Sequence, residues 1–246
     1  MPLFYNWSSI KSGYNNYTNS IVTSDLMIYV DASKSSSYPG SGNIFYDLSG
    51  NSKNMTISNC TYDGSKSFSF NGSTSYIVSP DIYTLFTSSN STFNQTHEIW
   101  FKSSSANGII IDEQGYGFPS SGWHDSQLEI VSNTIKARVW NQSPPYSTVG
   151  TNDTTKWMYV AFRYNGSANT IDGYFNGSPF SLTSVTRFFS PNPAGYHISL
   201  GYPDATNMGA GSAFSGNIAI YRTYKRPLTN SEILQNYNSE KSSFGY

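Results

Sequence analysis

Charged side chains are scarce in this chain of 246 residues. Asp, Glu, Lys and Arg make up 12% of the sequence and leave a formal net charge of −1, whereas ordinary soluble domains carry about 25% charged residues. No block of like charges occurs. We therefore expect no binding to nucleic acid, because that binding depends on basic side chains that neutralise phosphates.

Cysteines and long apolar runs are also missing. Cys60 is the single cysteine, so the chain can form neither an internal disulfide nor a multi-thiolate metal site. No apolar stretch approaches the ~20 residues that cross a bilayer. The opening MPLFYNWSSIKSGYNN has neither a basic segment nor a continuous apolar one, so we expect no export signal.

Aromatic residues and glycines are plentiful instead. The chain has 20 Tyr, 15 Phe, 5 Trp and 20 Gly, which supplies enough apolar area for a folded core and suits strands joined by tight turns. All-β sandwiches of this length commonly form one domain. We expect a single antiparallel β-sandwich over residues 25–246.

Short alternating or apolar segments predict the strands. Residues 25–32, DLMIYVDA, place Leu26, Ile28 and Val30 on one side and polar or larger residues on the other, which is typical of a half-buried strand. Asn-Gly and Asp-Gly pairs between such segments mark hairpin turns. Further strands are predicted at 66–70, 75–78, 98–102, 108–111, 127–131, 134–140, 157–164, 170–175, 196–200 and 214–221.

One helix is predicted near the end of the chain. Thr229 and Glu232 have the spacing of a capping box, and Leu228 and Ile233 flank them as a hydrophobic staple. A helix this short is not stable alone. We therefore expect it to dock on the sandwich through Ile233, Leu234 and Tyr237, and truncation at Thr229 to destabilise the domain.

Residues 1–24 show no sustained period and are predicted to form an amino-terminal arm. Trp7, Ile10 and Tyr14 are apolar residues within it, so we expect the arm to dock rather than to extend into solvent. The surface that receives it is either a neighbouring subunit or the chain's own sandwich.

Several blocks of the sequence resemble a known family. They are LMIYVDASKSSSYPGSGNIFYDLSGNSKNMTI (26–57), SFSFNGSTSYI (67–77), WMYVAFRYNGSANTIDGYFNG (157–177) and FSGNIAIYRTYKRPLTNSEILQNYNSEKSSFG (214–245). These four blocks resemble laminin-G-like jelly rolls of the concanavalin A-like lectin/glucanase superfamily. The resemblance is specific at both ends and looser in the middle. It implies a jelly roll that closes on the capped helix.

Two stretches within these blocks, YPGSG…DLSGN (38–51) and SEILQNYN…K…FG (231–245), resemble virion proteins of phages and large DNA viruses. The resemblance implies a non-enzymatic structural component of a capsid, decoration or fibre, made in the host cytoplasm and located in the virion. Its partners would be other capsid or fibre subunits, with a trimer as the expected homo-oligomer. The alternative is a lectin-like module that recognises glycans on the host surface.

Catalysis is not indicated. Glucanases of this superfamily carry Glu-x-Asp-x-x-Glu on one strand, and this chain has no such motif. Side chains of Asp112 and Glu113 are expected on opposite faces of a strand, and Glu129 is isolated. The three histidines of the chain are His97, His124 and His197. A Ser-His-Asp triad is not indicated, because no Gly-x-Ser-x-Gly elbow is present.

Calcium sites occur on the rims of some related jelly rolls. Asp112 with Asp125, or Asp172 with Asp204, would be the candidates here, but no loop concentrates three acids. Turn capping by these Asp side chains is the competing interpretation. We expect no metal and no cofactor.

An aromatic platform with nearby amides is the expected binding site for a glycan or a protein partner. The segment EQGYGFPSSGWHDSQ (113–127) is the first candidate and WNQSPPYS (140–147) is the second. Alternatively, Trp123 or Trp140 caps the sandwich core. The candidate binding residues are Tyr116, Phe118, Trp123, His124, Gln127, Trp140 and Tyr146.

Overall fold

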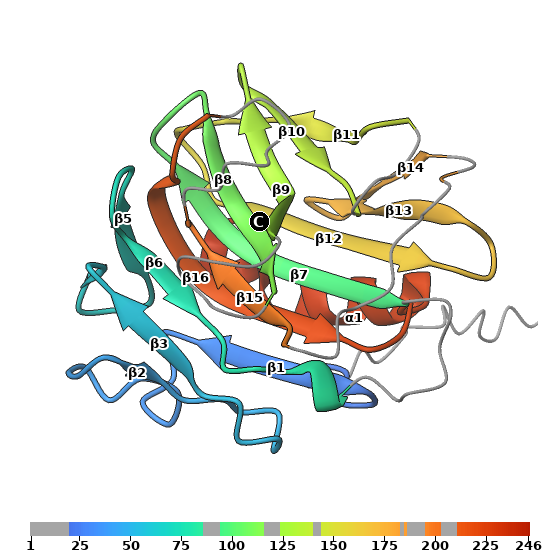
Figure 1. Ribbon diagram of the computed structural model, residues 1–246. Coiled ribbons are helices and arrows are strands. Elements are labelled where there is room, and N and C mark those ends of the chain that lie inside the picture. Colours follow the sequence, from blue (N-terminus) through green and yellow to red (C-terminus); the bar gives the residue numbers. More distant parts are fainter. Residues whose placement is uncertain are drawn as a thin grey trace, which may run out of the picture.

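The computed structural model describes residues 20–85, 94–115, 124–139, 144–182, 185, 195–202 and 211–246. Over these ranges, sixteen strands form two antiparallel sheets packed face to face, and one α-helix lies outside them near the C-terminus (Figure 1). This arrangement confirms the all-β sandwich with a short terminal helix.

The strands are β1 (Leu26–Asp31), β2 (Ile44–Phe45), β3 (Met55–Ser58), β4 (Thr61–Tyr62), β5 (Phe68–Asn71), β6 (Tyr76–Val78), β7 (Gln95–Ser103), β8 (Gly108–Gln114), β9 (His124–Val131), β10 (Thr134–Ala137), β11 (Ser147–Thr151), β12 (Met158–Asn165), β13 (Thr170–Phe175), β14 (Ser178–Leu182), β15 (His197–Leu200) and β16 (Ser215–Tyr224). The helix is α1 (Asn230–Glu240), and 3-10 turns lie at Tyr83–Leu85 and Lys241–Phe244.

The first sheet has the order β14-β13-β12-β7-β16-β5-β4. Its centre is the long strand β16, which pairs with β7 along one edge. Along the other edge, β5 pairs with the first part of β16 and β1 pairs with the second part. The beginning and the end of the domain are therefore hydrogen-bonded to each other.

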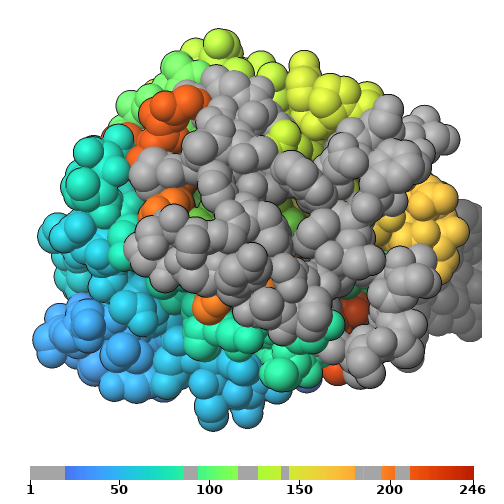
Figure 2. Space-filling view, in the orientation of Figure 1, coloured from blue at the N-terminus to red at the C-terminus, as the bar shows by residue number. Residues whose placement is uncertain are grey.

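The second sheet has the order β11-β10-β9-β8-β15-β6-β3-β2. In the space-filling view, the blue and cyan early strands lie at the lower left, and the green-yellow strands β9 to β11 lie at the top (Figure 2). At the β11 end, this sheet packs against β13 and β14 of the first sheet. The two sheets therefore meet along that edge.

Five short strands escaped the sequence prediction: β2, β3, β4, β11 and β14. They have two to five residues each, which is too few for a period of two to stand out. The segment predicted at 134–140 also forms a strand only as far as Ala137.

Two apolar clusters hold the sandwich and the helix. The larger lies between the sheets and includes edge-to-face rings such as Phe45 and Phe68, whose centroids are 5.1 Å apart. The second lies between the first sheet and α1, where Trp100 stacks on Phe244 with centroids 4.2 Å apart. No helix among the described residues is long and apolar enough to span a membrane.

The start of α1 has the capping box expected from the sequence. The Thr229 side chain accepts from the Glu232 amide, and the Glu232 side chain accepts from the Thr229 amide. Ile233 is fully buried and Tyr237 nearly so, and both belong to the cluster under the helix. Leu234 is half-buried and packs against the same cluster.

Strand β1 differs from the expectation of a half-buried strand, because all six of its residues are buried. Ile28 and Val30 face the core between the sheets. Leu26 and Tyr29 belong to the cluster that also contains the helix residues. The prediction of one exposed face was wrong, because the docked C-terminal segment covers the face that alternation assigned to solvent.

Arg222 of β16 joins the first sheet to α1 through a buried ion cluster. Its guanidinium donates to Glu98 of β7 at 2.9 Å and to both carboxylate oxygens of Glu240 at the end of α1. Arg222 and Glu98 are fully buried. Burial by itself would lower the pKa of Arg222, but the carboxylates of Glu240 and Glu98 raise it well above its ordinary value.

Neutral donors complete this cluster. The Tyr159 hydroxyl and the Asn236 amide donate to Glu98 at 2.7 and 2.8 Å. The Trp100 indole donates to Glu240 at 2.9 Å. These bonds satisfy the charges that burial would otherwise leave unpaired.

The end of the predicted arm lies on the chain's own domain. Asn236 of α1 accepts from the Val22 amide at 2.8 Å, and the Tyr224 hydroxyl donates to the Val22 carbonyl at 3.0 Å. The arm residues Trp7, Ile10 and Tyr14 lie outside the described residues, so their contacts stay a prediction.

Removing the buried cation is predicted to destabilise the whole domain. Arg222→Met leaves two carboxylates near each other with no positive partner, so we expect the free energy of unfolding to fall by about 3–5 kcal/mol. Urea denaturation at pH 7 measures it. Lys34→Met is the control, because the Lys34 side chain is 49% exposed and forms a longer ion pair, 3.7 Å, with Asp31. This variant should lower the free energy of unfolding by less than about 1 kcal/mol. Equal, small costs for both variants would contradict the role of the cluster.

The helix cap is predicted to lose its contribution in acid. Hydrogen bonding from Arg226 lowers the pKa of Glu232 from 4.5 to about 2. Because the folded state favours the ionised form, this stabilisation is complete above pH 4.5 and disappears as the pH falls towards 2. The difference in unfolding free energy between wild type and Glu232→Gln should shrink over that range. Arg226→Met should weaken this pH dependence, and the hydrogen bonds from Thr229, which also lower the pKa of Glu232, should preserve part of it. If the difference between wild type and Glu232→Gln stays the same from pH 4.5 to pH 2, the prediction is refuted.

Candidate functional site

The predicted aromatic loops fall largely outside the described residues. The residues that lie outside the described ranges are Tyr116, Phe118, Trp123 and Trp140. For His124, only the backbone position in β9 is described. Gln127 is fully buried, so its amide is not presented at the surface. Tyr146 is 38% exposed and the Lys136 ammonium lies 3.9 Å from its ring centroid.

The acidic pair on β8 points to two sides of the second sheet. Glu113 accepts from Gln95 of the opposite sheet at 3.1 Å, so it points into the sandwich. Asp112 accepts from Gln114 and Ser199 of its own sheet. The sequence-based expectation of opposite faces is confirmed, and the pair does not act together on one substrate.

Two other titratable candidates, His97 and Asp172, have structural surroundings. His97 is buried, stacks on Phe162 with centroids 4.9 Å apart, and lies 2.8 Å from the Tyr221 hydroxyl. Asp172 is paired with Arg163. Among the described residues, no group of three His, Cys, Asp or Glu side chains is arranged to hold a metal ion.

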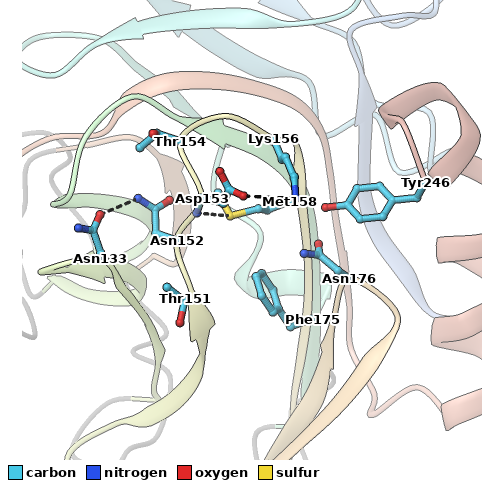
Figure 3. A pocket seen from close by; sticks show the side chains of 10 residues that line it. All are labelled: Asn133, Thr151, Asn152, Asp153, Thr154, Lys156, Met158, Phe175, Asn176 and Tyr246. Carbon is cyan, nitrogen blue, oxygen red and sulfur yellow. Dashed lines mark hydrogen bonds and ion pairs between the residues drawn. The ribbon is translucent and has the colours of Figure 1, made fainter.

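A polar cleft of about 630 Å³ opens where the β11 edge of the second sheet meets the first sheet. It is assembled from four separate parts of the chain, and Figure 3 shows Tyr246 on the side opposite Asn133 and Asn152. The lining residues are Asn133, Thr151, Asn152, Asp153, Thr154, Lys156, Met158, Phe175, Asn176 and Tyr246.

The wall formed by the β9–β10 turn and the end of β11 is built on amides. The Asn152 side-chain nitrogen donates to the Ser105 carbonyl at 3.1 Å and to Asn133 at 3.3 Å. Asn133 adopts a positive φ of 63° in its turn, which Asn tolerates better than most residues. These bonds hold the Asn152 amide against the cleft.

The opposite wall follows the Asn-Gly turn between β13 and β14. Asn176 has a φ of 49°, and its side-chain oxygen accepts from the Tyr159 amide at 2.8 Å. Gly177 follows at φ 80°, where a Cβ would lie 2.6 Å from the Tyr237 ring. The turn is thereby packed on α1 and presents Asn176 to the cleft.

Aromatic and apolar groups form the rest of the surface. Tyr246 is 41% exposed, and its hydroxyl donates to the Trp157 carbonyl at 2.6 Å, which holds the ring at the cleft. The half-buried Phe175 ring lies over Gly150, where a Cβ would come within 2.5 Å of it. Met158 is fully buried beneath.

The charges at the cleft balance each other. Lys156 lies 3.6 Å from Asp153, and both side chains are solvent-accessible. A hydrogen bond from the Thr155 hydroxyl to Asp153, at 2.6 Å, lowers the pKa of that carboxyl. The cleft therefore presents an ionised but paired carboxylate at neutral pH.

Sequence reasoning did not identify this cleft. Asn152 and Asn176 were visible only as two of the eleven Asn-X-Ser/Thr sites in a chain rich in these residues, and Asn176-Gly177 only as a turn. No local pattern relates them to Tyr246, because their proximity depends on how the two sheets meet.

Comparisons with known proteins agree with the fold. A family model described as the concanavalin A-like lectin/glucanases superfamily matches residues 71–234. No curated protein matches the chain. Among solved structures, Trypanosoma rangeli sialidase in complex with sialic acid is similar with 16% identity and a TM-score of 0.66, covering 92% of this chain and 35% of that one. This chain therefore spans about a third of the sialidase.

Two smaller solved structures are similar over more of their own length. Domain 4 of an extracellular arabinanase from Geobacillus stearothermophilus, in complex with arabinotriose, has 19% identity and a TM-score of 0.55, covering 87% of this chain and 98% of that one. The receptor binding domain of a botulinum neurotoxin C/D mosaic serotype has 16% identity and a TM-score of 0.56, and the match covers 89% of this chain and 52% of that one. At these identities the likeness concerns the fold alone.

Crowding the Phe175 ring is predicted to strain the cleft wall. Gly150→Ala should lower the free energy of unfolding by about 1–3 kcal/mol, because the ring must leave its place. Urea denaturation measures the effect, with Thr148→Ala on the same strand as the control. In a Phe175→Ala background the same change should cost less than about 0.5 kcal/mol. An equal cost in both backgrounds would show that the ring is not the constraint.

Proposed function

Because the chain belongs to the concanavalin A-like lectin/glucanases superfamily, we propose that it binds carbohydrate, without cleaving it, in the cleft beside Tyr246. The observation that carries the proposal is the exposed Tyr246 ring held over a cleft lined by side-chain amides and hydroxyls. Sugars offer apolar C–H faces and many hydroxyls. Such a ligand matches an aromatic surface with a few placed polar groups.

The composition of the cleft favours binding over hydrolysis. The usual glycosidase mechanisms need two carboxyl groups that flank the scissile bond. Asp153 is the only side-chain carboxylate among the residues that line this cleft in the described part of the chain. It is already paired with Lys156.

Relatives with the same fold support the proposal. The arabinanase domain, whose length this chain nearly matches, was solved with arabinotriose. The sialidase was solved with sialic acid. Both are sugar complexes, so oligosaccharides of arabinose and sialic acid belong in the first binding panel.

A structural role in a virion, with capsid or fibre subunits as partners, is the second proposal. It rests on the sequence resemblance of residues 38–51 and 231–245. None of the solved structures described above is a virion protein. The described end of the arm also contacts α1 of its own chain through Val22 rather than leaving the domain. A carbohydrate-binding domain displayed on a virion would reconcile both proposals.

Loss of the Tyr246 ring is predicted to weaken sugar binding. An oligosaccharide array selects the best ligand for wild type, and isothermal titration calorimetry then measures its dissociation constant. Tyr246→Ala should weaken binding about tenfold or more, equivalent to ~1.4 kcal/mol. Tyr46→Ala is the matched control, because Tyr46 is also exposed, at 43%, and lies outside the cleft.

Tyr146→Ala separates this cleft from the loop expected from the sequence. If binding depends on Tyr146 and not on Tyr246, the sugar site lies beside 140–147 and the proposed cleft is wrong. If no oligosaccharide binds the wild type, the proposed function fails altogether.

A further inference from the structure

Asn152 leaves a buried hydrogen-bond acceptor without a partner among the described residues, in the wall of the cleft. Its Nδ2 donates to the Ser105 carbonyl, which can only accept, so the orientation of the amide is determined by the backbone. Figure 3 shows the nitrogen toward Asn133 and the oxygen turned away from it. Asn152 is only 7% exposed, and within the described residues its Oδ1 has no hydrogen-bond partner.

Asn176 presents the complementary donor. Its Oδ1 accepts from the Tyr159 amide, so its Nδ2 is directed away from the backbone. Asn176 is half-buried, and among the described residues its Nδ2 makes no hydrogen bond to the protein. The cleft therefore offers one acceptor and one donor, each with its chemical role assigned by a main-chain group.

An apolar surface lies between these two amides. Figure 3 shows Met158 and Phe175 between Asn152 and Asn176. Met158 is fully buried, and the Phe175 ring is held over Gly150. A ligand group that satisfies both amides must therefore also cover the half-buried Phe175 ring.

We infer that the cleft recognises the acetamido group of an N-acetylated amino sugar. The acetamido N–H donates to Asn152 Oδ1, its carbonyl accepts from Asn176 Nδ2, and its methyl packs on the Phe175 ring. This inference rests on the proposed function, because it names the class of sugar that the same cleft takes.

Other sugar substituents match fewer of these features. A hydroxyl has its donor and acceptor on one oxygen and carries no methyl group. A carboxylate has no donor for Asn152, and the nearest cation, Lys156, is already paired with Asp153. A buried acceptor without a partner costs free energy, so a ligand that supplies an N–H recovers that cost.

The test compares three ligands that differ only at one substituent. Isothermal titration calorimetry measures the binding of the β-1,4-linked trimers of N-acetylglucosamine, glucosamine and glucose to the full chain. We expect the acetylated trimer to bind at least tenfold more tightly than either of the others.

Asn176→Asp removes the donor and keeps the acceptor that the Tyr159 amide requires. Asp also tolerates the positive φ at this position. The preference for the acetylated trimer should fall below about twofold. Asn165→Asp is the matched control: it makes the same charge change in the β12–β13 turn, where Asn165 accepts from the Ser167 and Ala168 amides, and should retain the preference. Unfolding by urea confirms that both variants are folded.

Each outcome separates the inference from the proposed function. Equal binding of the three trimers, with dependence on Tyr246, overturns the acetamido inference and leaves carbohydrate binding intact. Absence of binding to the trimers and to every array oligosaccharide overturns both. Acetylated trialanine that binds as tightly as the acetylated sugar, and loses affinity in Asn176→Asp, also overturns the inference, because the cleft then recognises a peptide.

Discussion

The docking of α1 on the first sheet depends on a buried cation, Arg222. Arg222 lies between the Glu98 carboxylate of the first sheet and the Glu240 carboxylate at the end of α1. Arg222 and Glu98 are fully buried, and the Glu240 side chain is 11% exposed. Removing Arg222 leaves both carboxylates without their cationic partner in a nonpolar setting. The helix held in this way covers Trp100 and is followed by the 3-10 turn Lys241–Phe244, whose Phe244 stacks on the same indole. Tyr246 comes next. The aromatic wall of the cleft is therefore positioned by an ion cluster on another part of the sheet.

Structural roles and the proposed binding roles coincide in the turn amides of the cleft. Asn176 uses one end of its side chain to satisfy the Tyr159 amide and presents the other end to the cleft. Asn152 does the same with the Ser105 carbonyl. Because each amide is anchored by a backbone bond, its free end cannot rotate to exchange donor for acceptor. Such fixed polarity lets a short side chain discriminate between ligand groups of similar size.

The candidate site was predicted from clusters of aromatic residues along the chain, and this is why the cleft was missed. Tyr146 does lie at the surface, but Gln127 from the preferred segment is buried. The cleft instead collects isolated residues from turns that are far apart in sequence. Asn133, Asn152 and Asn176 are ordinary turn residues when considered separately, and Tyr246 is far from all three in sequence. Their combination follows from the contact of β11 with β13 and β14.

Local chemistry alone determined the sandwich class, most of the longer strands and the capping box of α1. These depend on residue alternation and on side chain to backbone bonds that span three or four residues, so they are readable without the fold. Tertiary structure decided which faces are buried: β1 alternates as a half-exposed strand, yet α1 and the segment that precedes β1 cover its second face. Tertiary structure also decided the cleft, because whether an amide is satisfied or left facing a ligand depends on partners dozens of residues away. Ser105 and Asn152 are 47 residues apart, and no local pattern carries information over that distance.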